Sequence, residues 1–151
     1  MTSRRALLAL TMIAAPGVAG AQSRGAPAPP LALPAGMSPL PHGAYRVAFR
    51  GNATTLPDGA AEALAEIGRR LAATAAGSGR ITVEGQASGP RNDASTARRI
   101  SLERAIAVRK ALVAGGLDET RVDVRGLGRV PAGLDAADVL PPGAVRAGQR
   151  G

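Results

Sequence analysis

The sequence predicts an α+β fold, a two-layer βαβαβ sandwich in which two helices cover one face of a small mixed sheet. Short segments with alternating apolar side chains fit half-buried strands, and two longer segments carry apolar residues at helical spacing. These segments follow one another as strand, helix, strand, helix, strand between residues 44 and 130. Stacking both helices on one face of the sheet is the simplest way to bury their apolar stripes.

The N-terminus has the features of an export signal. Residues 1–21 combine a basic start, an apolar stretch too short to span a bilayer, and small residues before Gln22. They predict a cleaved signal peptide and an exported mature chain with no transmembrane segment. Without Arg4 and Arg5, the formal net charge of +8 becomes +6. The paired arginines also fit a twin-arginine signal, so the export route stays open.

A proline-rich segment follows the signal. Residues 22–43 contain six prolines and show neither helical nor alternating periodicity, which predicts an extended linker. Leu31 and Leu33 could dock on the domain or on a partner. A disordered tether is the commoner outcome for such a composition.

The first predicted strand and helix begin the domain. From Tyr45 to Phe49 the letters YRVAF alternate along the chain, as in a half-buried strand. Pro57 and Asp58 suit a helix start, because proline fits an early helical position and an acid is favourable near the positive end of the helix dipole. The apolar stripe of this helix is Leu64, Ile67 and Leu71.

The second strand and helix carry the most unusual residue. Ile81 and Val83 alternate in the strand, and the helix runs from about Ser95 to Ala114 before a glycine pair that suits its C-terminus. The stripe on this second helix reads Ile100, Arg104, Val108 and Leu112, so that a guanidinium stands where an aliphatic side chain is expected.

The third strand closes the predicted domain. Val122 and Val124 alternate with charged residues in it. Because Pro141 and Pro142 cannot join a regular strand ladder, residues 131–151 are predicted to form a flexible tail. The alternative is that Asp138 to Leu140 supplies a very short strand.

Composition excludes several function classes. The chain has no cysteine and a single histidine, His42, so the sequence predicts no metal site, no thiolate chemistry and no Ser/His charge system. Tyr45 and Phe49 are its only aromatic residues, too few for a nucleic-acid stacking platform. No nucleophile, base and orienting group converge, so we expect no enzyme activity and no cofactor.

Four stretches carry a family resemblance. They are VAFRGNATTLPDGAAEALAEIGRRL from Val47, ITVEG from Ile81, ISLERAIAVRKALVAGGL from Ile100 and DETRVDVRGLG from Asp118. Their order and spacing resemble the OmpA-like C-terminal domain, a periplasmic module of outer-membrane proteins, peptidoglycan-associated lipoproteins and flagellar stators. The resemblance covers residues 44–128.

The resemblance implies a non-catalytic, peptidoglycan-binding or wall-proximal module in the periplasm, associated with the cell wall or outer membrane. In that family, a loop aspartate and a helix arginine hold the zwitterionic end of diaminopimelate in the stem peptide. Arg104 stands at the arginine position, but Ser88 replaces the aspartate, so the chain resembles a divergent member. Candidate ligand-binding residues are Arg104, Ser88, Ser101 and Asp93, with no catalytic residue among them.

Two functions stay open. The partner is either the diaminopimelate stem peptide of peptidoglycan or another envelope protein, the latter for a degenerate domain that acts as an interaction or structural module. Arg104 either contacts the ligand, or lies at the edge of the helix face with its stem packed and its head in water, or pairs with a structural acid such as Glu84. On the sequence alone, leucine at position 104 would complete the aliphatic stripe and leave the fold intact.

Overall fold

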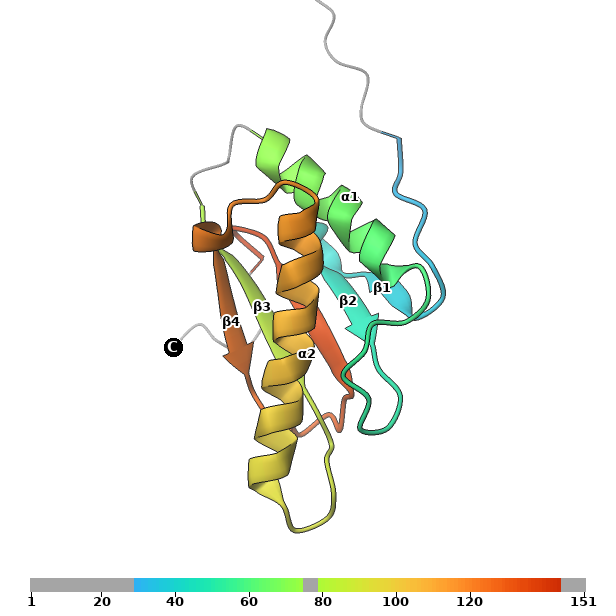
Figure 1. Cartoon of the computed structure of the whole chain (residues 1–151), viewed down its shortest axis with the longest axis vertical. Coiled ribbons are helices and arrows are strands. Elements are labelled where there is room, and N and C mark those ends of the chain that lie inside the picture. Colours follow the sequence, from blue (N-terminus) through green and yellow to red (C-terminus); the bar gives the residue numbers. More distant parts are fainter. Residues whose placement is uncertain (1–28, 75–78, 145–151) are drawn as a thin grey trace, which may run out of the picture. The chain divides into compact units, whose positions relative to one another are not determined.

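The computed structural model describes residues 29–74 and 79–144, so the predicted signal peptide lies outside the described residues. One compact unit begins at Leu31 and holds every described helix and strand (Figure 1). In chain order its elements are β1 (Met37–Pro39), η1 (Pro41–Gly43), β2 (Tyr45–Ala48), α1 (Ala60–Ala73), β3 (Ile81–Gln86), α2 (Ala94–Ala114), η2 (Glu119–Arg121), β4 (Val122–Gly126) and β5 (Ala136–Leu140).

The strands form a single mixed sheet in the order β1-β2-β5-β3-β4. β3 and β4 run parallel and are joined through α2, whereas the other neighbouring strands run antiparallel. Both helices lie on one face of the sheet (Figure 1), with α2 packed on β3, β4 and β5, and α1 packed on α2. The predicted α+β class is therefore confirmed.

The core lies between the helices and the sheet, and one glycine sets how closely α2 approaches. A Cβ atom on Gly85 in β3 would overlap the backbone carbonyl of Ser101, so α2 can cross β3 this closely only above a glycine. Arg104 lies one turn further along α2, and its guanidinium reaches the carbonyl of Gln86, the last residue of β3. Buried apolar members of the predicted stripes and strands are Val47, Phe49, Leu64, Ile67, Ile81, Val83, Ile100, Val108, Leu112 and Val122.

The prediction of a flexible tail over residues 131–151 is wrong for its described part. Ala136–Leu140 forms β5, which pairs with β2 on one side and with β3 on the other. Pro141 and Pro142 follow the last residue of this strand, so they end it without removing a ladder hydrogen bond. The segment is thus a central strand of the sheet.

The predicted linker also ends earlier than expected. Of residues 22–43, the part from Leu31 onward belongs to the compact unit, where Leu31 and Leu33 are partly buried against the core. Met37–Pro39 forms β1 and pairs with β2. Proline is tolerated in β1 because the strand lies at the sheet edge, where one row of backbone groups needs no partner.

Candidate ligand site around Arg104 and Asp135

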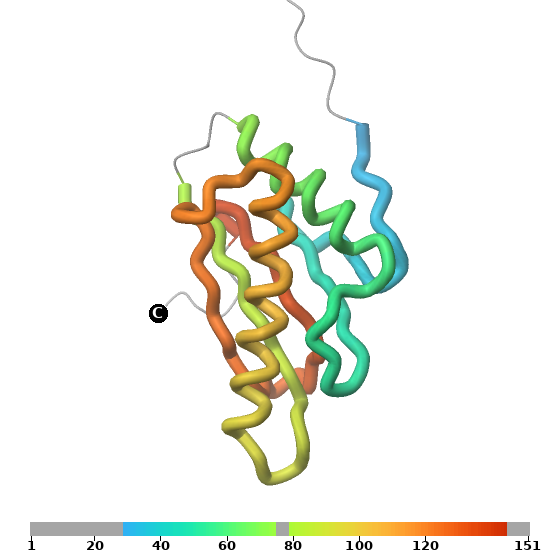
Figure 2. Tube along the Cα trace, in the orientation of Figure 1, coloured from blue at the N-terminus to red at the C-terminus, as the bar shows by residue number. Residues whose placement is uncertain are grey.

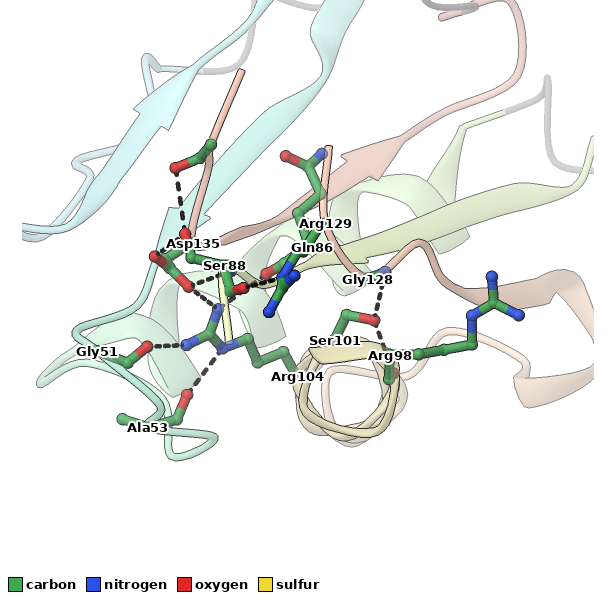
Figure 3. Close-up of polar contacts among 11 residues, drawn as sticks. Gly51, Ala53, Gln86, Ser88, Arg98, Ser101, Arg104, Gly128, Arg129 and Asp135 are labelled. Atoms are coloured by element: carbon green, nitrogen blue, oxygen red, sulfur yellow. Dashed lines mark hydrogen bonds and ion pairs between the residues drawn. The ribbon is translucent and has the colours of Figure 1, made fainter. Parts of the chain in front are cut away.

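Arg104 projects from the middle of α2 into the interior, and its side chain is fully buried. Figure 3 shows its guanidinium surrounded by oxygen acceptors from different parts of the chain. Nε donates to the carbonyl of Ala53 at 2.8 Å, Nη2 to that of Gly51 at 2.5 Å, and Nη1 to that of Gln86 at 2.8 Å. Nη1 also contacts Asp135 Oδ1 at 2.8 Å.

An aromatic ring completes the surroundings of this cation. The Arg104 Cζ atom lies 4.9 Å from the ring centroid of Phe49, a distance suited to a cation–π interaction. A guanidinium has five N–H donors, and the backbone carbonyls and Asp135 occupy most of them. The charge is therefore satisfied within the chain, as a buried charge requires.

Asp135, directly before β5, supplies the negative charge of the site. Its Oδ1 also accepts the backbone N–H of Ser88 at 3.0 Å, and its Oδ2 accepts the Ser88 hydroxyl at 2.8 Å. Partial burial favours the neutral acid, but the hydrogen bonds from Arg104 and Ser88 together outweigh that effect and lower the pKa of Asp135. The carboxylate is thus ionised at neutral pH, and 26% of its side chain is exposed.

Ser88 is held in place by a second arginine. The Nε atom of Arg129 donates to the Ser88 carbonyl at 2.8 Å, and Nη2 donates to the carbonyl of Pro90. The loop after β3 is thereby tied to the loop after β4. Ser88 and Arg104, both predicted site residues, meet through their shared contacts with Asp135 (Figure 3).

The other two predicted site residues have local structural contacts. The hydroxyl of Ser101 is buried, donates to the Arg98 carbonyl at 2.7 Å and accepts the Gly128 N–H at 2.8 Å. It therefore ties α2 to the turn after β4. Because the Ser101 side chain is fully buried, a ligand cannot reach this hydroxyl in the present conformation.

Asp93 caps the N-terminus of α2. It accepts the backbone N–H of Thr96 at 2.8 Å and the Thr96 hydroxyl at 2.6 Å. These bonds, the one from the hydroxyl foremost, lower the pKa of the Asp93 carboxyl. Within the described part of the chain, the hydrogen bonds of the Asp93 side chain are these local ones, so the structure does not bring it into the Arg104 network.

The structural acid beside Arg104 is Asp135 and not Glu84. The Cα partners of Glu84 in the sheet are Asp138 of β5 and Arg125 of β4. Sequence reasoning missed Asp135 because the segment around it was assigned to a tail. The available signal was its place at the start of a short segment ending in Val139 and Leu140, which could have been taken as a strand.

A cleft lies beside this network. It has a volume of about 420 Å³, a size suited to a small ligand. Phe49 and Ala53 contribute to its wall and also contact Arg104, so the cleft and the network share a boundary. Its lining residues are Ala35, Gly36, Ala48, Phe49, Arg50, Ala53, Thr55, Leu56, Pro57 and Asp58.

The described residues lack a metal-binding cluster and a membrane-spanning helix. Within residues 29–74 and 79–144, no three His, Cys, Asp or Glu side chains are grouped so that they could hold a metal ion. In the same part of the chain, no helix is both long and apolar enough to cross a membrane. The Asp135 carboxylate can form hydrogen bonds and charge pairs.

The fold is similar to that of several solved envelope proteins. One is the peptidoglycan-associated lipoprotein from Burkholderia pseudomallei, with a TM-score of 0.54 and 20% identity over 64% of this chain and 88% of that one. Another is the OmpA-like domain of FopA1 from Francisella tularensis, with a TM-score of 0.50 and 17% identity over 72% and 75% of the two chains. The periplasmic domain of Helicobacter pylori MotB has a TM-score of 0.52 and 11% identity over 64% and 73%.

Sequence comparison identifies the family directly. No curated protein sequence matches the chain. The OmpA family matches residues 48–138, a segment that runs from the end of β2 into β5 and includes Arg104, Ser88 and Asp135. Since this match covers more than half of the sequence and agrees with the similarity of fold, the chain belongs to the OmpA family.

Proposed function

We propose that the chain is an exported, non-catalytic module of the bacterial envelope that binds peptidoglycan through the diaminopimelate-containing stem peptide. Family membership and the fold shared with a peptidoglycan-associated lipoprotein support a place in the envelope. The observation that carries the proposal is the ionised carboxylate of Asp135, held beside Arg104 and Ser88 and partly exposed. In this proposal the Asp135 carboxylate supplies the negative charge that the family aspartate would carry and that Ser88 lacks.

Asp135 determines which part of the ligand binds there. A partly exposed carboxylate accepts an ammonium group well, and Oδ2 of Asp135, which accepts the Ser88 hydroxyl, has a second lone pair for this bond. The carboxylate of the ligand needs a cation other than Arg104, because this guanidinium is fully buried and most of its donors are used within the chain. Arg50 is exposed and lines the neighbouring cleft, so we assign it this contact.

Sedimentation with isolated peptidoglycan sacculi tests the proposal. We expect wild type to be retained and Asp135→Asn to lose most of its retention, because the substitution removes the negative charge and keeps the shape. Asp138→Asn is the matched control: it also removes an arginine-paired acid, bound by Arg46 at 2.7 and 2.9 Å, but one that lies within β5 and does not pair with Arg104. Equal retention of wild type and Asp135→Asn would refute the assigned site.

A second candidate function rests on the burial of Arg104. Because this guanidinium has no exposed surface and contacts four oxygen acceptors of its own chain, the domain could keep the family fold without the family ligand. It would then act as a protein-interaction or structural module. Wild-type protein that stays in the supernatant at both low and high salt would favour this function.

A further inference from the structure

The outer edge of β4 has no strand partner among the described residues. β4 is the last strand in the sheet order and pairs only with β3, and Figure 2 shows its segment at the margin of the trace. The N–H of Leu127 donates to the Gly85 carbonyl, so the odd-numbered positions of this segment face β3. The backbone groups of Val122, Val124 and Gly126 therefore point away from the sheet.

The charges on β4 complement a second copy of the same strand. In an antiparallel pair centred on Val124, Val122 lies opposite Gly126 of the other copy, and these outward-facing residues exchange backbone hydrogen bonds. Asp123 then lies opposite Arg125 of the other copy, on both sides of the two-fold axis. These are non-hydrogen-bonded positions, where facing side chains come closest. An isologous dimer needs this self-complementarity.

An exposed apolar side chain lies next to the same edge. Leu102 of α2 is 41% exposed and is the one large hydrophobic side chain in the described region that is classed as exposed. A Cβ atom on Gly126 would lie 2.9 Å from the Leu102 Cβ, which places Leu102 directly over the end of β4. A strand added to β4 would cover part of this surface.

We propose that two copies of the chain associate through antiparallel pairing of their β4 strands, forming one continuous sheet. The existing contacts of Asp123 and Arg125 leave both side chains able to pair across the proposed interface. Asp123 pairs with Arg80 through both carboxylate oxygens, but its side chain is 41% exposed, and each oxygen has a further lone pair that can accept a second arginine. Arg125 is exposed, and within its own chain its charge acts on the Asp123 carboxylate, so its guanidinium is accessible to a second copy.

Charge reversal with rescue tests this dimer, using the full chain in analytical ultracentrifugation over a range of concentrations. We expect wild type to double its mass as concentration rises. Asp123→Arg and Arg125→Asp each place like charges opposite each other twice, which should weaken association by about tenfold or more. An equimolar mixture of the two variants should recover it, because each facing pair is again opposite in charge.

Two further samples complete the test. The double variant Asp123→Arg/Arg125→Asp should dimerise like wild type, and Arg91→Asp, a charge reversal in an exposed loop, should leave association unchanged. Circular dichroism establishes that each variant is folded. A folded wild type that remains monomeric, or single variants that dimerise as well as wild type, would overturn the proposal. So would a mixture that stays monomeric. None of these results depends on wall binding.

Discussion

At the scale of single residues, Arg104 connects three separate parts of the fold. Its guanidinium contacts the loop between β2 and α1, the end of β3, and Asp135 before β5. An aliphatic side chain at this position could fill the space but could satisfy none of these oxygen acceptors. The arginine is thus a structural centre of the domain, and any ligand binds beside it.

Arg104→Leu should therefore destabilise the fold, contrary to the expectation that leucine would simply complete the stripe. Removing one partner of a buried pair typically costs about 3–5 kcal/mol, because the other partner and its neighbours lose their hydrogen bonds. Urea denaturation followed by circular dichroism measures the free energy of unfolding. Ile100→Leu is a suitable control at a buried position of the same stripe, and an equal stability of Arg104→Leu and wild type would contradict this role.

The Asp135 carboxylate should make the contribution of this network depend on pH. Its pKa is lower in the folded chain than in the unfolded chain, so the stabilisation is present above the ordinary aspartate pKa and is lost as pH falls through the folded-state value. The difference in free energy of unfolding between wild type and Asp135→Asn should be largest near neutral pH. It should shrink below about pH 4. A difference that stays constant from pH 7 to pH 3 would exclude this explanation.

At the scale of elements, β5 matters most. It lies between β2 and β3, so without it the sheet would separate into β1 with β2 and β3 with β4. Both helices and the strands at 45–48, 81–86 and 122–126 could be predicted, because their apolar periodicity is clear. β5 was harder to predict from sequence. Ala136 and Ala137 give a weak strand signal, and an acid such as Asp138 is not expected at a buried strand position.

Asp135 was missed for the same reason. A site residue can be predicted from sequence only when the element next to it is predicted correctly. Asp135 directly precedes β5, a segment that the sequence analysis predicts to be part of a flexible tail. Ser88 and Arg104 were located through their family positions. Their common partner, 31 residues beyond Arg104 in the chain, is identified only once the strands are paired.

Truncation tests the central place of β5. A chain that ends at Val130 lacks Asp135 and β5 and should not fold cooperatively, whereas a chain that ends at Ala144 keeps every described element. Thermal unfolding followed by circular dichroism distinguishes the two outcomes. A cooperative transition in the chain ending at Val130 would restore the interpretation of residues 131–151 as a tail.

At the scale of the whole molecule, the compact unit is larger than the periodic segments indicate. Leu31 and Leu33 pack against the core, and β1 extends the sheet beyond β2. The family match starts at Ala48 and ends at Asp138, so the first strands precede it and the last residues of β5 follow it. A domain boundary chosen from periodicity or family match alone would remove structural residues at both ends.

The position of β5 also determines when the sheet can form. A ribosome makes the chain from its N-terminus, so the strand that joins the two halves of the sheet is the last to emerge. Arg46 and Asp138, which form an ion pair across β2 and β5, are 92 residues apart in the chain. Contacts this distant slow folding, because a long loop must close before they form. The nascent chain therefore remains incompletely folded until β5 has been made, and a fragment that ends before β5 has no closed sheet to protect it from proteolysis.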